Sequence, residues 1–208
     1  MFTFYLVIDL NELHIYLMKK LNDINNLDKL KREIYFCQNY SHRCLCKFFG
    51  FVKNGEEITG FLYEYLCNGS LESYVLSNKD KISDAFSMMT IIRVFQAIEY
   101  LNSNSLIHRD LKPLNIFLNN NFLPYVIDFD TIIHPREENE SSNTENTNDL
   151  GSVLYMSPEQ FAGKHVSYPT DIYSFGLIVY FLIEKKHMKS RKSTLHDSKI
   201  QAKGSTLL

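Results

Sequence analysis

One stretch, residues 108–115 (HRDLKPLN), constrains this chain more than any other, because it gathers an acid, a cation and an amide within eight residues. A strand-like apolar run at 125–127 follows it and ends in DFD at 128–130. Asp110 can accept a hydroxyl proton and Lys112 can sit on a transferring phosphate, while Asn115 and Asp128 offer hard oxygen ligands to magnesium. Phosphoryl transfer forms no bond to the protein and depends on positioned charge. We therefore predict that these four side chains converge on one nucleotide-bound metal site.

Residues 108–115 resemble the catalytic loop of eukaryotic-type protein kinases, H-R-D-L-K-P-x-N, and 128–130 resemble the metal-binding D-F-G triplet of that family. Residues 151–159 (GSVLYMSPE) resemble the peptide-docking segment G-T-x-x-Y-M-A-P-E, and 171–176 (DIYSFG) resemble the start of the central large-lobe helix. The alternative is a polar loop between two apolar segments, which leaves the order of these landmarks unexplained. The resemblance implies an α+β, protein-kinase-like fold of two lobes, with ATP and Mg²⁺ bound between them and a protein as phosphate acceptor.

Under this resemblance, Asp110 orients and deprotonates the acceptor hydroxyl, Lys112 steadies the γ-phosphate, and Asn115 and Asp128 hold magnesium. Lys112, together with Ser152 at the threonine position of the docking segment, favours serine or threonine acceptors. Tyrosine acceptors stay open.

The first third of the chain is typical of a small lobe. Strands are predicted at 1–10 and 14–19, and 16–19 (YLMK) take the place of the family's V-A-I-K. Lys19 would then contact the α- and β-phosphates, with Lys20 as the runner-up. A helix predicted over 25–39 carries Glu33, which would brace Lys19. The alternative for Glu33 is a solvent-facing charge.

An antiparallel hairpin is predicted over 48–52 and 58–65, turning at Gly55. In the resemblance it leads to the hinge between the lobes at 64–69. Tyr63 would be the gatekeeper, and Glu64 and Leu66 would offer backbone groups to adenine. The alternative is an ordinary strand and turn without a site.

Two apolar helices are predicted for the large lobe. Residues 83–103 begin with Ser83 and Asp84 as caps and present a broad apolar face, which predicts deep packing. Residues 172–183 are apolar all round and should be buried, with Asp171 capping the N-terminus. The later helices that cover this helix in the family are missing, so part of its apolar surface is expected to be left in water. In the family, the aspartate at position 171 also bonds the backbone of the catalytic loop. His108 is expected to be a buried, hydrogen-bonded structural histidine.

Several family landmarks are missing. The chain has no glycine before Gly50, so the phosphate-covering G-x-G-x-x-G loop is absent, and the resemblance stops after Glu184. We therefore expect a kinase fold cut at both ends, spanning 1–184, with a small lobe at about 1–65 and a large lobe at about 70–184. Residues 185–208 are expected to form a basic, disordered tail.

These gaps keep two alternatives open. One is a catalytically inactive module that binds nucleotide or a protein partner, and the other is an unfolded product. Asp130 stands where the family has glycine, which adds a charge and removes a flexible hinge, but the ligand Asp128 is intact.

Residues 136–149 contain no apolar side chain and take the place of an activation loop. Their hydroxyl groups are candidate phosphate acceptors: Ser141, Ser142, Thr144 and Thr147. A phosphate there would pair with Arg109 and order the loop. A mobile acidic loop without a switch is the alternative.

Composition limits the partners. The net charge of −2 gives no reason to expect nucleic-acid binding, and the longest apolar run is too short to span a bilayer.

Four cysteines without a second metal-type pair are expected to be core or incidental thiols. Few cysteines and no secretory signal predict a cytoplasmic setting, with the nucleus also possible in principle. Nothing indicates an oligomeric state.

Overall fold

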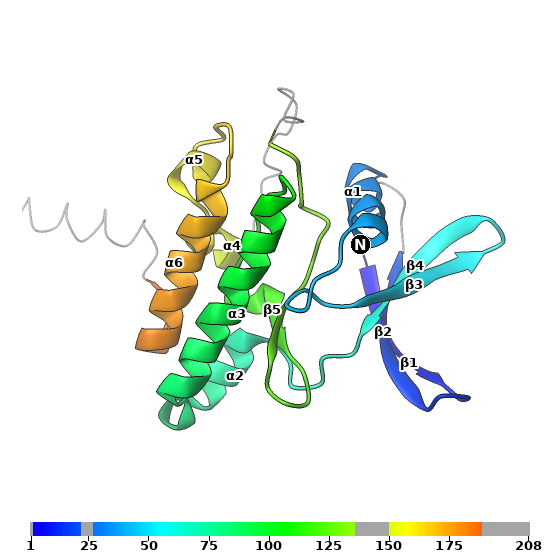
Figure 1. Cartoon of the computed structure of the whole chain (residues 1–208), viewed down its shortest axis with the longest axis horizontal. Helices are drawn as coiled ribbons and strands as arrows, with labels where there is room; N and C mark the ends of the chain where they lie inside the picture. Colours follow the sequence, from blue (N-terminus) through cyan, green and yellow to red (C-terminus); the bar gives the residue numbers. More distant parts are fainter. Residues whose placement is uncertain (1, 22–26, 136–149, 189–208) are drawn as a thin grey trace, which may run out of the picture.

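The computed structural model describes residues 2–21, 27–135 and 150–188. They form a strand-rich small lobe and a helical large lobe that lie side by side (Figure 1). This is the predicted mixed α+β architecture, in which the chain enters the large lobe after the fourth strand.

The small lobe is a four-stranded antiparallel sheet with one helix beside it. The strands are β1 (Phe2–Asp9), β2 (His14–Leu21), β3 (Phe48–Asn54) and β4 (Glu57–Glu64), in the order β1-β2-β4-β3. Helix α1 (Leu27–Asn39) lies in the part predicted as helical, and residues 25 and 26 of that prediction lie outside the described residues. The predicted strands pair as two hairpins, β1–β2 and β3–β4, and the pairing of β2 with β4 places Lys19 opposite Phe61.

The large lobe is built around two long helices, α3 (Asp84–Ser103) and α6 (Pro169–Glu184), which pack against each other. The remaining elements are α2 (Leu71–Ser77), η1 (Lys79–Lys81), η2 (Pro113–Asn115), β5 (Ile116–Leu118), β6 (Pro124–Val126), α4 (Leu150–Tyr155) and α5 (Pro158–Phe161). Helix α3 begins as predicted, because the Ser83 hydroxyl accepts a hydrogen bond of 3.1 Å from the backbone N–H of Phe86. The β5–β6 hairpin then connects the two segments that carry the candidate site.

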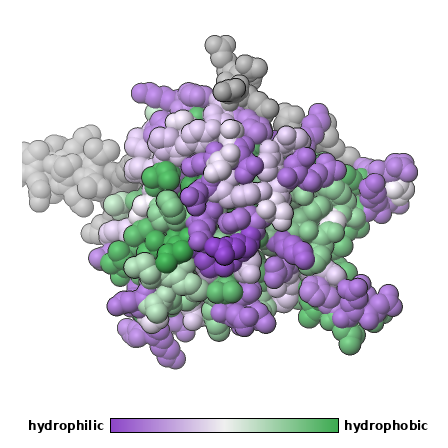
Figure 2. Space-filling model, viewed as in Figure 1, coloured by the Kyte–Doolittle hydropathy of each residue, from purple (hydrophilic) through white to green (hydrophobic). Residues whose placement is uncertain are grey.

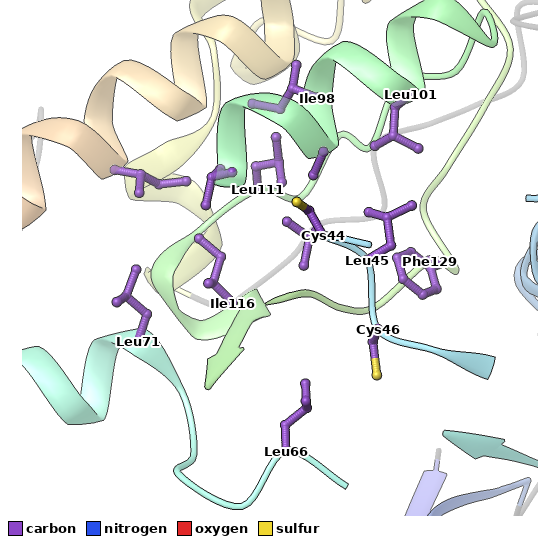
Figure 3. Close-up of a cluster of buried hydrophobic side chains, with 14 of the residues drawn as sticks. Cys44, Leu45, Cys46, Leu66, Leu71, Ile98, Leu101, Leu111, Ile116 and Phe129 are labelled. Atoms are coloured by element: carbon purple, nitrogen blue, oxygen red, sulfur yellow. The ribbon is translucent and has the colours of Figure 1, made fainter. Parts of the chain in front are cut away.

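The larger of two hydrophobic clusters among the described residues runs from α1 into the large lobe. Figure 3 shows Cys44 and Leu45 below helix α3, which carries Ile98 and Leu101, with Phe129 next to Leu45. Cys44 and Cys46 are both buried in this core. The candidate site therefore rests on a packed support that both lobes share.

The deep packing predicted for the two long helices is found along one face of each, and part of their apolar surface is exposed. On α6, Ile172 is 44% and Ile183 is 65% exposed, and on α3 Ile92 and Phe95 are 49% and 46% exposed. Hydrophobic side chains accordingly gather over α6 and α3 on the left of Figure 2. Each helix packs along one face only, because the described residues place no further layer over the outer face.

The packed part continues past the predicted boundary at Glu184. The His187 ring stacks on Phe181, its Nε2 lies 2.7 Å from Oε1 of Glu72, and its Nδ1 lies 2.9 Å from the hydroxyl of Tyr155. Residues 185–188 therefore belong to the large lobe, and residues 189–208 of the predicted tail lie outside the described residues. Within the described part of the chain, every helix is too short or too polar to cross a bilayer.

Candidate active site

Three of the predicted side chains meet at the catalytic-loop segment. Oδ2 of Asp110 lies 2.9 Å from Nζ of Lys112 and accepts a hydrogen bond of 2.9 Å from Nδ2 of Asn115. Nδ2 of Asn115 also donates to the Asp110 carbonyl at 2.9 Å. The 3-10 turn η2 between Lys112 and Asn115 makes this possible, since it folds the amide back over the carboxylate. Asp110 keeps 22% of its side chain exposed, so one carboxylate can be held by two neighbours and still meet an incoming hydroxyl.

The backbone that carries Asp110 is held from outside the loop. The carboxylate of Asp171 accepts hydrogen bonds from the backbone N–H groups of His108 (2.7 Å) and Arg109 (3.0 Å). The side-chain amide of Gln160 donates to the Arg109 carbonyl at 2.7 Å, and the Thr131 hydroxyl donates to the His108 carbonyl at 2.8 Å. These bonds fix the direction in which Asp110 leaves the chain.

The prediction that Asp171 caps the N-terminus of α6 is wrong. The helix begins two residues earlier at Pro169, so Asp171 lies inside the first turn and turns its carboxylate toward the catalytic loop. The family-based expectation that it bonds this backbone is confirmed. Burial raises the pKa of Asp171, and the two backbone donors and His108 oppose that rise. His108 is fully buried with Nε2 3.1 Å from the Ile127 carbonyl, in line with a structural role.

The DFD segment follows β6 and faces the same loop. The Ile127 N–H donates to the Asn115 carbonyl at 3.0 Å, which ties this segment to η2. Asp128 has a left-handed backbone (φ 69°), and the Phe129 ring packs 4.4 Å from Phe36 of α1. The turn of the backbone at Asp128 thus sends the aromatic ring into the core and leaves the carboxylate 37% exposed.

The backbone at residue 130, where the family has glycine, accommodates the aspartate side chain. Among the described residues with positive φ, Asp128 and Arg109 are found in this region and Asp130 is not, so a side chain at 130 causes no backbone strain. The Asp130 carbonyl accepts a hydrogen bond of 3.2 Å from Nε of Arg32. Asp130 lines the cavity, and its charge contributes to the negative field around Lys19 and Glu33.

Lys19 and Glu33 form a buried ion pair between β2 and α1. Nζ of Lys19 lies 3.0 Å from Oε1 and 2.9 Å from Oε2 of Glu33, and 3.4 Å from Oδ1 of Asp128. Burial disfavours the ammonium, but the carboxylates outweigh it and hold the pKa of Lys19 above its ordinary value. Lys20, the alternative, is exposed and lies against Tyr5. Glu33 is buried, so its alternative as a solvent-facing charge is wrong.

A cavity of about 600 Å³ lies between the lobes. Seven of the eight predicted site residues line it, and the eighth, Asp110, is bonded to two of them. Near the connection of the lobes, the Glu64 N–H donates to the Lys47 carbonyl at 2.9 Å, and the Glu64 carbonyl lies 3.7 Å from Sγ of Cys46. Leu66 is buried beside it. Phe2 also lines the cavity, and its ring lies 4.1 Å from Nζ of Lys19.

The donors present suit magnesium. Nδ2 of Asn115 is used by Asp110, which leaves its amide oxygen, and Asp128 adds a carboxylate on the same cavity. Hard oxygen ligands from one carboxylate and one amide, completed by phosphate oxygens and water, are the usual way in which Mg²⁺ is bound beside nucleotides. The residues therefore fit the ion that the sequence predicted.

Some predicted residues lie outside the described part. These are the side chain of Ser152 and residues 136–149, with their four candidate phosphate acceptors. Other residues were missed by the sequence analysis, namely the hydroxyl of Tyr63 on Glu33 (2.6 Å), the amide of Gln160 and the hydroxyl of Thr131. No periodicity or motif spacing marks these partners, since each contact joins distant segments.

The two lobes with a cavity between them match the arrangement that the resemblance to protein kinases implies, and so do the buried lysine–glutamate pair and the braced aspartate. A family model described as "Protein kinase domain" matches residues 3–206, and the chain belongs to the eukaryotic-type protein kinases. Its fold is an incomplete version of that α+β fold.

Curated relatives agree with this assignment. The chain is 31% identical over 164 residues to a probable LIM domain-containing serine/threonine-protein kinase of Dictyostelium discoideum. It is 30% identical over 181 residues to the G-type lectin S-receptor-like serine/threonine-protein kinase SD1-1 of Arabidopsis thaliana, and 27% over 179 residues to the RGS domain-containing serine/threonine-protein kinase A of D. discoideum. These alignments cover 77%, 85% and 86% of this chain but only 16%, 22% and 15% of the relatives. The chain thus spans a small part of the length of the proteins it matches.

Proposed function

We propose that this chain transfers the γ-phosphate of ATP to serine or threonine hydroxyls of protein substrates. The observation that carries the proposal is the placement of Asp110, whose Oδ2 is held at 2.9 Å by both Lys112 and Asn115 at the edge of the inter-lobe cavity. Relatives named serine/threonine-protein kinases support the choice of acceptor. The kinase part would span residues 1–184 at least, with lobes at about 1–65 and 70–184.

The reaction breaks the bond between the γ-phosphorus and the β,γ-bridging oxygen and forms a bond from the acceptor oxygen to the γ-phosphorus. The acceptor proton passes to the Asp110 carboxylate, and the electron pair of the broken bond leaves with ADP. Lys112 would offset the charge of the γ-phosphate, and Lys19, braced by Glu33, would bind the α- and β-phosphates. Mg²⁺, held by Asn115 and Asp128, would neutralise phosphate charge.

The test compares wild type with Asp110→Asn. Transfer of labelled γ-phosphate to serine-, threonine- and tyrosine-containing peptides is measured beside MgATP binding by calorimetry. Because the amide cannot accept the proton, we expect the variant to lose transfer by about 10²- to 10⁴-fold while binding MgATP within a few-fold of wild type. Equal transfer by the two proteins would refute the role of Asp110.

The same experiment separates the alternative of an inactive module. Two features of the cavity favour it, namely the Phe2 ring over the Lys19 ammonium and the extra carboxylate of Asp130. If the chain is such a module, the wild-type protein will bind MgATP but transfer no phosphate. Transfer to tyrosine peptides alone would change the acceptor class from serine or threonine to tyrosine.

A further inference from the structure

Glu33 is held by two strands of the sheet. Its Oε1 accepts hydrogen bonds from Nζ of Lys19 on β2 (3.0 Å) and from the hydroxyl of Tyr63 on β4 (2.6 Å). Oε2 accepts only from Lys19 among the described contacts, at 2.9 Å. The Tyr63 contact is the shorter of the two on Oε1, as expected for an O–H donor on a carboxylate.

The direction of the hydrogen bonds around Tyr63 follows from the groups present. A carboxylate can only accept, so the Tyr63 hydroxyl donates to Glu33. Sγ of Cys37 lies 3.2 Å from the same hydroxyl oxygen, and burial raises the pKa of this thiol to about 12. The Cys37 thiol therefore keeps its proton and donates to Tyr63, which makes Tyr63 a stronger donor toward Glu33.

Tyr63 is the more rigid of the two supports. Its ring is 6% exposed and lies 5.7 Å from Phe48, 6.1 Å from Phe61 and 6.4 Å from Phe129, measured between ring centroids. A tyrosine side chain has two rotatable bonds before the ring, and packed aromatic neighbours remove that freedom, whereas the lysine stem has four. Tyr63 thus fixes where the Glu33 carboxylate lies, and Glu33 in turn fixes the ammonium of Lys19.

We propose that Tyr63 is a positioning residue for nucleotide binding, whose hydroxyl holds Glu33 and, through it, Lys19 in the orientation that receives phosphates. This inference rests on the proposed function, because it assumes that Lys19 binds the phosphates of ATP. It assigns the hydroxyl a role separate from that of the ring, which forms the wall of the cavity.

The test compares two ligands, MgATP and adenosine, on Tyr63→Phe. Phenylalanine keeps the ring and its packing and removes only the hydroxyl. We expect MgATP affinity to fall about tenfold, as for loss of a hydrogen bond to a charged group, while adenosine affinity stays within about twofold. Adenosine carries no phosphate, so damage to the cavity would weaken both ligands and lost positioning of Lys19 would weaken MgATP alone.

Two further variants sharpen the result. Tyr74→Phe is the matched control, because the Tyr74 ring packs against Phe86 and its hydroxyl has no hydrogen bond among the described residues. It should bind both ligands as wild type does. In a Glu33→Gln background, Tyr63→Phe should cost less than about twofold further, since the uncharged amide no longer orients Lys19.

The outcomes decide the inference separately from the proposed function. Equal losses for MgATP and adenosine, or a tenfold loss that persists in the Glu33→Gln background, would overturn the role of Tyr63 and leave the proposed function standing. Failure of wild type to bind MgATP would overturn both. Circular dichroism checks that each variant folds. If Tyr63→Phe does not fold, Cys37→Ala replaces it, and we expect its affinity for MgATP alone to fall about twofold. No selective loss there would also contradict the inference.

Discussion

At the scale of single residues, the candidate site depends on two backbone conformations that non-glycine residues seldom adopt. Arg109 and Asp128 have φ values of 68° and 69°. Such residues cost of order 1–3 kcal/mol each and persist only where their surroundings hold them. At Arg109 the N–H donates to Asp171 and the carbonyl accepts from Gln160, so both ends of the residue are held.

Asp171→Asn tests this bracing. The carboxylate accepts from two backbone N–H groups, whereas an amide can accept from one and turns an N–H toward the other. We expect a loss of about 2–3 kcal/mol in the free energy of unfolding, measured with urea, and a parallel drop in phosphoryl transfer. Asp80→Asn, at an exposed position in η1, is the control and should change neither. Equal behaviour of the two variants would show that the bracing is unimportant.

At the scale of elements, α6 shows how an apolar sequence is divided between core and surface. Leu182 is 1% exposed and its neighbour Ile183 is 65% exposed. Successive helical residues point about 100° apart, so neighbours of the same apolar character can differ fully in burial. The helix packs against α3 along one face, and its other face forms part of the surface seen in Figure 2.

This difference predicts opposite sensitivities at adjacent positions. Leu182→Ala should lower the free energy of unfolding by about 2–5 kcal/mol, because it removes buried methyl groups and leaves a cavity. Ile183→Ala should change it by less than about 0.5 kcal/mol, as at other surface positions. Urea unfolding of the two variants measures both values. A large loss at Ile183 would mean that this face is covered in the folded protein.

At the scale of the whole molecule, the main hydrophobic core joins the lobes and a cavity lies between them. Phe129 packs against Phe36 of α1 and is flanked by Tyr63 and His108, so residues of both lobes meet around one ring. A ligand bound in the cavity would therefore contact both lobes and stabilise their arrangement.

MgATP should accordingly raise the thermal stability of the chain. A ligand that binds only the folded state stabilises it by about 2.7 kcal/mol at a hundredfold excess over its dissociation constant. The effect is measured by thermal unfolding of wild type and of Asp128→Asn, each with and without MgATP. The variant is the control for the magnesium-dependent part of the effect. We expect the variant to lose the magnesium-dependent part, and an equal rise in both proteins would contradict the assignment of Asp128.

Much of this architecture was accessible from the sequence. The four strands, α1 and the two long helices follow from periodicity and turn residues, and the charged residues of the site follow from the resemblance to protein-kinase motifs. The exposure of Ile92 and Phe95 on α3 was not accessible, because apolar character does not say which face of a helix finds a neighbour.

The order of the elements and the positions of the charged side chains can be read along the chain, because hydrogen-bonding patterns and side-chain periodicity act over a few residues. Which groups meet depends on the three-dimensional packing. The Tyr63–Glu33 contact joins residues 30 positions apart, and the bond from His108 to Asp171 spans 63. Such pairings depend on how the lobes pack around Phe129, and packing is a property of the folded chain as a whole.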